Sequence, residues 1–397
     1  MISEREALAA ILAAVPAPET ESLPLSAAAG RIAARDVHAT LPLPSFDNSA
    51  MDGWALHEAD CGKTGVPLRI AGEQRAGADR RLTVRPGEAA RIFTGAPLPA
   101  GTAAVVMQED AVRDGDTVTI REAGQPGEFI RRAGSDVCAG QLLIRQGVPL
   151  TPQRIGVLAA QGLTLVDCGK LPRAAIVCTG EELIAPGQPL PHAGALYNSN
   201  APMLAALLES SRTAAPQSVD TVRDDLTALT DCLHRRLEES DALLIAGGVS
   251  VGDHDLVKPA LQQLGITPQF WRIAVKPGKP FLFCTAGRKL IFGLPGNPVS
   301  AFVTAILFVL PALRRLAGAT DAAPVLTTAH SLTDLHNKGD RTHYLRGQYD
   351  PAAGTFALTG TQESHAIAGL SNANALARLE PGAQVTTGGE VRVLRLE

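Results

Sequence analysis

The sequence predicts a multidomain α/β protein in which a central, doubly wound and mostly parallel sheet is joined to small β-rich domains, including a C-terminal β barrel. The chain has 397 residues, more than one ordinary domain of about 100–200 residues. Residues 173–325 alternate strand-like apolar runs with helical stretches, which is typical of a sheet covered by helices on both faces. Residues 46–137 instead contain short strand-like runs between glycine and proline turns, typical of a small β domain. Residues 326–397 return to short strands, typical of a small barrel or sandwich.

The N-terminal region is expected to begin with an amphipathic helix. The stretch MISEREALAAILAAV is acidic at its start, and Ser3 with Glu6 forms a capping-box pattern, which favours a helix over a signal peptide. Residues 1–45 and 138–172 are predicted to form one discontinuous linker and helical domain, in which Pro152 begins a second helix. The remaining domains are predicted at 46–137, 173–325 and 326–397.

The central region supplies the strands and helices of the main sheet. RAAIVCTG and DALLIAGG are apolar runs that predict buried strands, and NSNAPMLAALLESS predicts a helix capped by Asn198 or Asn200. FLFCTAGRKLIFGLPGNP has the pattern of a hairpin. VSAFVTAILFVLPALRRL is apolar enough for a membrane span, but it follows a glycine–proline turn and contains Pro311, which favours a buried core helix.

Charge and cysteine usage exclude several classes of protein. The net charge is −4, from 36 basic and 40 acidic residues, and this balance argues against general nucleic-acid or membrane-surface binding. The six cysteines are scattered without a CxxC pair, so neither a zinc motif nor a dense disulfide framework is indicated. Reduced thiols in the cytoplasm are the favoured interpretation.

Polar loops follow the strands of the central region. In an open α/β sheet, ligands bind at the carboxyl ends of the strands, so we expect these loops to meet in one site. The five loops are CTGEEL (178–183), VRDD (222–225), GGVSVGDHD (247–255), KPGKP (276–280) and GLPGNPVS (293–300).

Five carboxylates lie in these loops. An acidic residue at a loop end is usually a solvated cap, but several at one sheet edge make a site for a hard cation reasonable. Magnesium takes oxygen ligands and shares them with substrate phosphates. The five residues are Glu181, Glu182, Asp224, Asp225 and Asp255.

Gly247 and Gly248 follow a buried strand. Glycine lets backbone N–H groups approach and cradle a phosphate, and a tight turn is the alternative interpretation. The loop matches neither a Walker A sequence nor GxGxxG, so ATP hydrolysis and dinucleotide binding have no direct support. A magnesium–phosphate role is as well supported as the tight turn because of the residues that follow, which are Ser250, Asp253, His254 and Asp255.

Two lysines are held between prolines in AVKPGKPF. Only 7 of the 36 basic residues are lysine, and the prolines limit backbone freedom, so that the charges of Lys276 and Lys279 are placed in advance. The pattern predicts a pocket for a small oxyanion, with a solvated surface turn as the alternative. GLPGNPVSAF places Asn297 at a helix cap and Ser300 in the first turn, where free N–H groups also favour an anion.

Further polar clusters occur in FDNSAMDGWA, RIFTGAPLPAG and RRAGSDV. Their chemistry alone indicates Asx-type turns and no particular reaction. The residues are Asp47, Asn48, Ser49, Asp52, Thr94, Arg131, Arg132 and Asp136.

The motifs together resemble those of a known family. FDNSAMDGWA, IFTGAPLPAG, AVVMQED, IRRAGSDV, CTGEEL, IAGGVSVGDHD, KPGKPF and GLPGNPVSA are similar, in this order, to the motifs of the molybdopterin molybdenumtransferases, the family of bacterial MoeA and the gephyrin E-domain. The resemblance covers essentially the whole chain. It implies an enzyme that takes adenylylated molybdopterin and molybdate, requires Mg²⁺ and releases AMP in the final step of molybdenum cofactor biosynthesis.

The resemblance has consequences for architecture and partners. It implies a cytoplasmic homodimer of four-domain chains, whose third domain is similar to the adenylyltransferase MogA. A separate molybdopterin adenylyltransferase is implied as the partner that supplies the substrate, and neither nucleic acid nor a membrane is implied.

The resemblance also implies roles for particular residues. The molybdate-binding positions are Lys276, Lys279, Pro280, Ser300, Arg346 and Ser364. The positions that are both catalytic and magnesium-binding are Glu182, Asp225 and Asp255. Further catalytic positions are Asp52, Thr94 and Asp136, which either the same chain or the partner subunit could supply to a given active site. Contacts to the pterin nucleotide are expected from Gly247, Gly248, Ser250 and Asn297.

Two other functions compete with this interpretation. A non-catalytic carrier or scaffold for molybdopterin or the molybdenum cofactor would need no magnesium site. A nucleotide-sugar or phosphotransfer enzyme on a similar α/β domain would turn over ATP without a pterin. Release of AMP from adenylylated molybdopterin separates the enzyme from both.

Overall fold

The computed structural model describes residues 1–77, 80–249 and 255–396. The contacts divide the chain into two compact units. The first unit comprises Met1–Arg35, Gln146–Gly156 and Thr164–Glu397, and the second comprises Asp36–Arg145 and Val157–Leu163. The division into four domains stays a prediction. Ser250, Asp253 and His254, which the sequence placed in a phosphate loop, lie outside the described residues.

A six-stranded sheet forms the centre of the first unit, in the order β16-β13-β17-β21-β20-β18. Its first four strands are mutually parallel, and β20 and β18 continue it antiparallel, so the predicted mostly parallel sheet and hairpin are confirmed. The strands are β13 (Arg173–Thr179), β16 (Ala215–Val222), β17 (Ala242–Ala246), β18 (Phe270–Trp271), β20 (Leu282–Ala286) and β21 (Lys289–Leu294).

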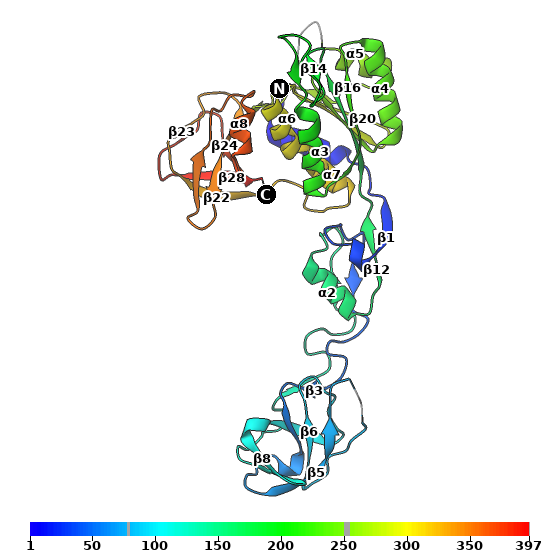
Figure 1. Ribbon diagram of the computed structural model, residues 1–397, viewed down its shortest axis with the longest axis vertical. Helices are drawn as coiled ribbons and strands as arrows, with labels where there is room; N and C mark the ends of the chain where they lie inside the picture. Colours follow the sequence, from blue (N-terminus) through cyan, green and yellow to red (C-terminus); the bar gives the residue numbers. More distant parts are fainter. Residues whose placement is uncertain (78–79, 250–254, 397) are drawn as a thin grey trace. The chain divides into compact units, whose positions relative to one another are not determined.

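Helices cover both faces of this sheet (Figure 1). Along β13, Ile176 belongs to the same buried cluster as Leu204 of α3, whereas its neighbour Val177 belongs to the cluster of Leu229 of α4. This alternation follows from the period of two in a strand, and it explains why the whole run is apolar. The helices are α1 (Glu4–Ala14), α3 (Asn200–Ser211), α6 (Pro298–Thr304) and α7 (Leu310–Leu316) on one face, and α4 (Leu226–Glu239) and α5 (Val257–Gln263) on the other.

Two predicted helix caps are present. The Ser3 side chain accepts from the Glu6 N–H while Glu6 accepts from the Ser3 N–H over 2.8 Å, which completes the capping box of α1. The Asn198 Oδ1 atom accepts from the Ala201 N–H over 3.1 Å at the start of α3.

The apolar helix Pro298–Leu316 is a core helix. It comprises α6, a π-helical turn η4 (Ala305–Val309) and α7. Its mean hydropathy of 1.7 and its 19 residues would suffice for a membrane span, but 83% of its apolar window is buried within the protein, as the sequence predicts.

The C-terminal region is a closed five-stranded barrel, as predicted. The strands pair in the ring β24–β25–β22–β28–β26 and back to β24 around a core that includes Phe356 and Val393. The short strand β19 (Val275–Lys276) joins this ring in parallel with β24, so that Lys276 lies opposite His343. The barrel strands are β22 (Leu326–Ser331), β24 (Thr342–Asp350), β25 (Thr355–Leu358), β26 (Ala375–Leu379) and β28 (Glu390–Arg395).

The remaining elements are small. In the first unit, β1 (Thr20–Pro24) pairs with β12 (Leu165–Gly169), β14 (Leu183–Ile184) with β15 (Leu196–Tyr197), and β23 (Leu335–His336) with β27 (Gln384–Val385), and α8 (Ile367–Ser371) precedes β26. Helix α2 (Pro152–Ala160) follows the predicted Pro152 start.

The second unit is built on another six-stranded sheet, in the order β7-β4-β6-β5-β9-β8. Its strands are β4 (Gly53–His57), β5 (Pro67–Gln74), β6 (Glu88–Ile92), β7 (Thr102–Met107), β8 (Ala111–Asp114) and β9 (Thr117–Ile120). Two short pairs complete the unit, β2 (Val37–His38) with β11 (Leu142–Ile144) and β3 (Asn48–Ser49) with β10 (Ile130–Arg131).

Candidate functional site

A cleft of ≈ 760 Å³ lies at the carboxyl ends of the four parallel strands. Gly180 follows β13, Asp224 follows β16, Gly247 follows β17 and Gly296 follows β21, and all four line the cleft. Parallel strands end at one edge of their sheet, which is why segments far apart in the sequence meet there. We call this the acidic cleft.

The glycines after β17 are required by close backbone approach. Gly247 has φ +97, and a Cβ atom there would lie 2.4 Å from the carbonyl oxygen of Thr179. Gly248 has φ +61, and its Cβ would lie 2.9 Å from the Thr179 Cγ2 atom. Any larger residue would push the β17 loop away from β13. The loop backbone therefore forms part of the wall of the acidic cleft, where the sequence predicts phosphate contacts.

Three carboxylates line the acidic cleft, those of Glu182, Asp224 and Asp255. Asp224 accepts from the Thr179 hydroxyl over 2.9 Å, which fixes its orientation at the end of β13. The Glu182 carboxylate folds over Gly180, because a Cβ on that glycine would lie 2.7 Å from Oε2.

Asp225, predicted as a magnesium ligand and catalytic residue, is absent from the cleft lining. Its side chain accepts from the Ala228 N–H over 2.7 Å as the N-cap of α4. The capped N–H is one of the four at a helix start that lack an intrahelical partner. Its neighbour Asp224, which is one of the five loop carboxylates but has no role implied by the family resemblance, lines the cleft.

The donor set of the acidic cleft fits a magnesium ion that is shared with a phosphate. Within residues 1–77, 80–249 and 255–396, no three His, Cys, Asp or Glu side chains are gathered as a ready-made metal cage. Magnesium is usually bound by one or two carboxylates together with substrate phosphates and water, so a cage is unnecessary. Glu182, Asp224 and Asp255 supply the hard oxygen ligands that this mode of binding uses.

A second cavity of ≈ 280 Å³ adjoins the first and shares Pro280, Pro295 and Asn297 with it. We call it the cationic pocket. It contains five of the six predicted molybdate-binding residues, which are Lys276, Lys279, Pro280, Ser300 and Ser364. Its lining also includes Arg341, His343, Gln362 and Glu363.

Tight packing and backbone hydrogen bonds hold the lysine loop in place. The carbonyl of Lys279 accepts from the Ile273 N–H over 3.2 Å. Gly278 has φ +134 and packs against the last residue of α6, because a Cβ atom on Gly278 would lie 2.6 Å from the Thr304 Cγ2 atom. Both lysine side chains remain exposed to solvent, so their charges are available at the cavity while the backbone that carries them is fixed.

Arg346, the sixth predicted ligand, does not line the cationic pocket. It is 1% exposed, and its guanidinium donates to the carbonyls of Thr361 and, over 3.1 Å, of Glu363. Burial lowers the pKa of Arg346, and the nearby Glu363 partly offsets this effect. In this structure Arg346 shapes the loop that presents Ser364.

Asn297 takes a different partner from the one that its cap position predicts. Its side chain makes no capping hydrogen bond to α6. The Asn297 amide donates instead to the Ser364 hydroxyl over 3.0 Å, which links the helix start to a loop of the barrel. Asn297 lines both cavities, so it lies at their junction.

Sequence reasoning missed Arg341 and His343. The Arg341 guanidinium donates to the Val275 carbonyl over 3.2 Å, and His343 is 7% exposed. The pKa of His343 is lowered to about 4, first by burial and then by Lys276, Arg341 and Arg346. No local motif marks these residues, because only the pairing of β24 with β19 brings them to the lysine loop.

The second unit contains its own polar pair. The Asp52 Oδ1 atom accepts from both the backbone N–H and the hydroxyl of Thr94, each over 2.7 Å. These two hydrogen bonds lower the pKa of Asp52. Asp136 belongs to the same unit and is exposed, with its backbone N–H donating to the Leu43 carbonyl over 3.0 Å. The structure thus brings Asp52 and Thr94 together.

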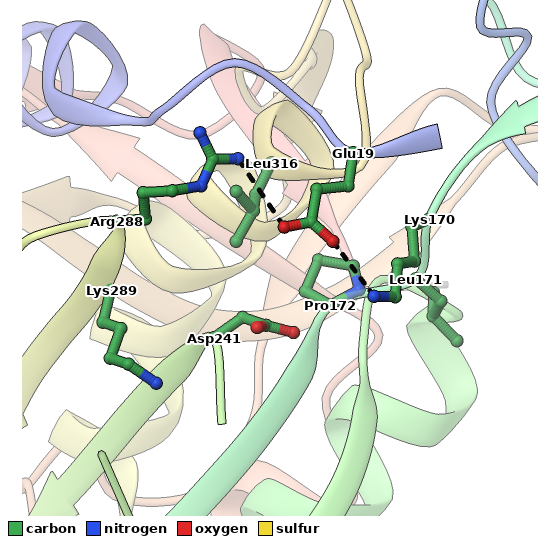
Figure 2. Close-up of a pocket in the computed structure, with 8 residues that line it drawn as sticks. All are labelled: Glu19, Lys170, Leu171, Pro172, Asp241, Arg288, Lys289 and Leu316. Carbon is green, nitrogen blue, oxygen red and sulfur yellow. Dashed lines mark hydrogen bonds and ion pairs between the residues drawn. The ribbon is translucent and has the colours of Figure 1, made fainter. Parts of the chain in front are cut away.

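A further charged cavity lies at the opposite, amino-terminal edge of the main sheet (Figure 2). Pro172, Asp241 and Lys289 occur where β13, β17 and β21 begin. Figure 2 shows Glu19 between Lys170 and Arg288, with N–O separations of 3.0 and 3.9 Å. Glu19 forms ion pairs with two of the three cations that line the cavity, and no predicted site residue lines it, so we assign no ligand to it.

Three family models match consecutive parts of the chain. Residues 2–162 match the MoeA N-terminal region (domain I and II), residues 175–315 match a probable molybdopterin binding domain, and residues 328–396 match the MoeA C-terminal region (domain IV).

Whole-chain relatives agree with these matches. The chain is 37% identical to the molybdopterin molybdenumtransferase of Nostoc sp., over 95% of this chain and 89% of the relative. It is 34% identical to that of Haemophilus influenzae, over 98% and 97%. A crystal structure of the molybdopterin biosynthesis MoeA protein from Pyrococcus horikoshii superposes with a TM-score of 0.87 at 28% identity, covering 100% of both chains.

Proposed function

The chain belongs to the molybdopterin molybdenumtransferase (MoeA) family, and from this premise we propose that it inserts molybdenum from molybdate into adenylylated molybdopterin and releases AMP. Relatives at 32–37% identity over most of the chain carry the transferase name, so the protein is an enzyme of molybdenum cofactor biosynthesis. The adenylylated substrate, the magnesium ion and the release of AMP are the proposed part.

The observation that carries the proposal is the junction of the two cavities. The acidic cleft offers carboxylates and glycine backbone, which suit a diphosphate with a divalent cation. The cationic pocket offers the ammonium groups of Lys276 and Lys279, which suit a small dianion. Because the cavities share Pro280 and Asn297, a pterin nucleotide in one would lie next to molybdate in the other.

Each cavity has a separate task in the proposed reaction. Magnesium held with Glu182, Asp224 and Asp255 would reduce the negative charge of the diphosphate. The chain's own residues fix the position of the substrate, and the cationic pocket holds molybdate beside the dithiolene. Proximity and charge stabilisation account for most of the expected rate enhancement, and no covalent nucleophile is needed.

We extend the proposal to the assembly and its partner. As the family resemblance implies, the assembly is proposed to be a homodimer in which a partner subunit supplies the Asp52–Thr94 pair. Mixing a chain altered at Asp52 with a chain altered at Lys279 should then restore activity. A separate adenylyltransferase supplies the substrate. The six free cysteines support a reducing, cytoplasmic location.

The decisive experiment measures AMP. The purified protein is incubated with adenylylated molybdopterin, molybdate and Mg²⁺, and AMP is quantified over time. Glu182→Gln should slow AMP release by about 10²-fold or more, because it removes a charged oxygen ligand from the cleft. The matched control is Glu181→Gln, whose side chain does not line the cleft. If the wild-type protein binds the pterin but releases no AMP, it is a carrier and the catalytic proposal is wrong.

A further inference from the structure

His343 is an unusual residue to find in a pocket for an anion. It lines the cationic pocket, is 7% exposed and lies opposite Lys276 in the β19–β24 pairing. Its Nε2 atom is buried and has no hydrogen-bond partner among the described residues. A buried polar atom without a partner is rare in folded proteins, and a bound water or ion is one explanation for it.

The charged groups that lower the pKa of His343 are all cations. Lys276 is on β19, and Arg341 and Arg346 are on or next to β24 itself. On the other side of β24, the residue paired with His343 is Leu379 of β26, which carries no charge. The remaining charged groups in the pocket lining are Lys279 and Glu363. Burial and the charges of Lys276, Arg341 and Arg346 together favour the neutral imidazole.

A bound dianion would reverse this balance. Two negative charges beside the ring would offset much of the field of the lysines and arginines, and an imidazolium next to an oxyanion is favourable. Binding of the dianion and binding of a proton would then each strengthen the other, as linkage requires.

We propose that His343 is an additional ligand of the oxyanion in the cationic pocket, and that it takes up a proton from solvent when the dianion binds. The inference rests on the proposed function, because it assumes that molybdate occupies this pocket. Neutral His343 contributes one N–H donor, and protonated His343 adds a positive charge. The proton balance is simple: protein, dianion and one proton form one complex, and no bond in molybdate is broken.

Calorimetry tests the proton uptake directly. Molybdate is titrated into the full-length protein without pterin, at about pH 6, in buffers that differ in their enthalpy of ionisation. We expect a net uptake approaching about one proton per bound molybdate, which vanishes above about pH 8 where the ring stays neutral. Affinity should rise as the pH falls over the same range.

Variants separate His343 from the rest of the pocket. His343→Gln keeps a neutral donor but cannot take up the proton, so the uptake should disappear while the affinity at about pH 8 stays within about threefold. His336→Gln alters an exposed histidine of β23 and should retain the wild-type uptake.

A measurement on the wild-type protein covers the case in which His343→Gln does not fold. Tungstate is added as a molybdate analogue, and the imidazole carbon-bound proton signals are followed by NMR at about pH 6. One buried histidine should shift toward its protonated position. Absence of such a shift when tungstate binds, or unchanged proton uptake in His343→Gln, refutes the role of His343 and leaves the proposed function standing. Absence of any oxyanion binding by the wild-type protein overturns the pocket assignment as well.

Discussion

The Asn297 side-chain amide donates a hydrogen bond of 3.0 Å to the hydroxyl of Ser364. This contact joins the N-cap residue of α6 to the barrel loop held by Arg346, at the junction of the two cavities. Asn297→Ala should weaken molybdate binding by about fivefold, which corresponds to about 1 kcal/mol for one hydrogen bond. Calorimetry of Asn297→Ala, Ser364→Ala and the double variant gives the coupling energy between the two residues. Asn372→Ala, at an exposed barrel position, is the control, and additive effects of the two substitutions would show that the contact is unimportant.

Lys279→Ala should raise the molybdate concentration required for half-maximal AMP release by about 10–100-fold. The reason is the loss of one charged contact, worth about 1.5–3 kcal/mol. Binding of the pterin nucleotide should persist, because the acidic cleft is unchanged. Lys338→Ala removes an exposed lysine elsewhere on the barrel and should behave as wild type. A wild-type molybdate requirement in Lys279→Ala would contradict the pocket assignment.

Asp224 and Asp225 form a matched pair of adjacent carboxylates with different roles. Asp224→Asn should reduce AMP release by about 10²-fold and raise the magnesium requirement, because this carboxylate faces the acidic cleft. Asp225→Asn should leave activity near wild type, and Asp225→Ala should lower the free energy of unfolding by about 1 kcal/mol through loss of the α4 cap. Rates and unfolding curves for both positions give the answer. A larger catalytic loss at Asp225 than at Asp224 would support the catalytic role that the family resemblance implies for Asp225.

Gly278→Ala should destabilise the lysine loop. The residue has φ +134, and the added Cβ would meet Thr304 Cγ2 at 2.6 Å. We expect a loss of about 1–3 kcal/mol in the free energy of unfolding, and weaker molybdate binding as the lysines shift. Thr304→Ser removes the methyl group but keeps the hydroxyl that donates to the Ser300 carbonyl, so adding it to Gly278→Ala should recover part of the loss. No recovery in the double variant would attribute the whole effect to backbone strain.

The stability of the oxyanion-free protein should depend on pH through His343. Its pKa is about 4 in the folded protein against an ordinary value of 6.5. Between these values the unfolded chain binds a proton that the folded chain does not, so the free energy of unfolding decreases as the pH falls from about 6.5 to about 4. The full effect is roughly 3 kcal/mol. Denaturant unfolding across this range should show a smaller pH dependence for His343→Gln than for His336→Gln.

Much of the candidate site is predictable because it follows from local patterns. The loops after β13, β16, β17 and β21 meet because parallel strands end at a common edge, and that edge can be located from apolar runs alone. The role of Gly247 and Gly248 is also predictable from local sequence, because a glycine pair directly after a buried strand indicates close backbone approach.

The other features of the candidate site depend on three-dimensional geometry that the spacing of residues along the sequence does not reveal. Whether Asp224 or Asp225 faces the cleft is decided by where α4 begins, and a shift of one residue would exchange their roles. His343 reaches the lysine loop only through pairing between distant strands. Arg346 could be identified from its motif, but the direction of its guanidinium, toward backbone carbonyls, could not.

The pairing of β19 with β24 places residues of the barrel and of the lysine loop around one cationic pocket. Lys276 is held by the barrel sheet, whereas the carbonyl of Lys279 is held by Ile273. An oxyanion that touches both lysines, Ser300 of α6 and Ser364 of the barrel would therefore fasten the barrel to the main sheet. Anion binding and the contact between barrel and main sheet would then be coupled, so that each strengthens the other. Consumption of molybdate by the reaction would remove this added link and leave the protein–protein contacts, such as that of Asn297 with Ser364, to hold the barrel.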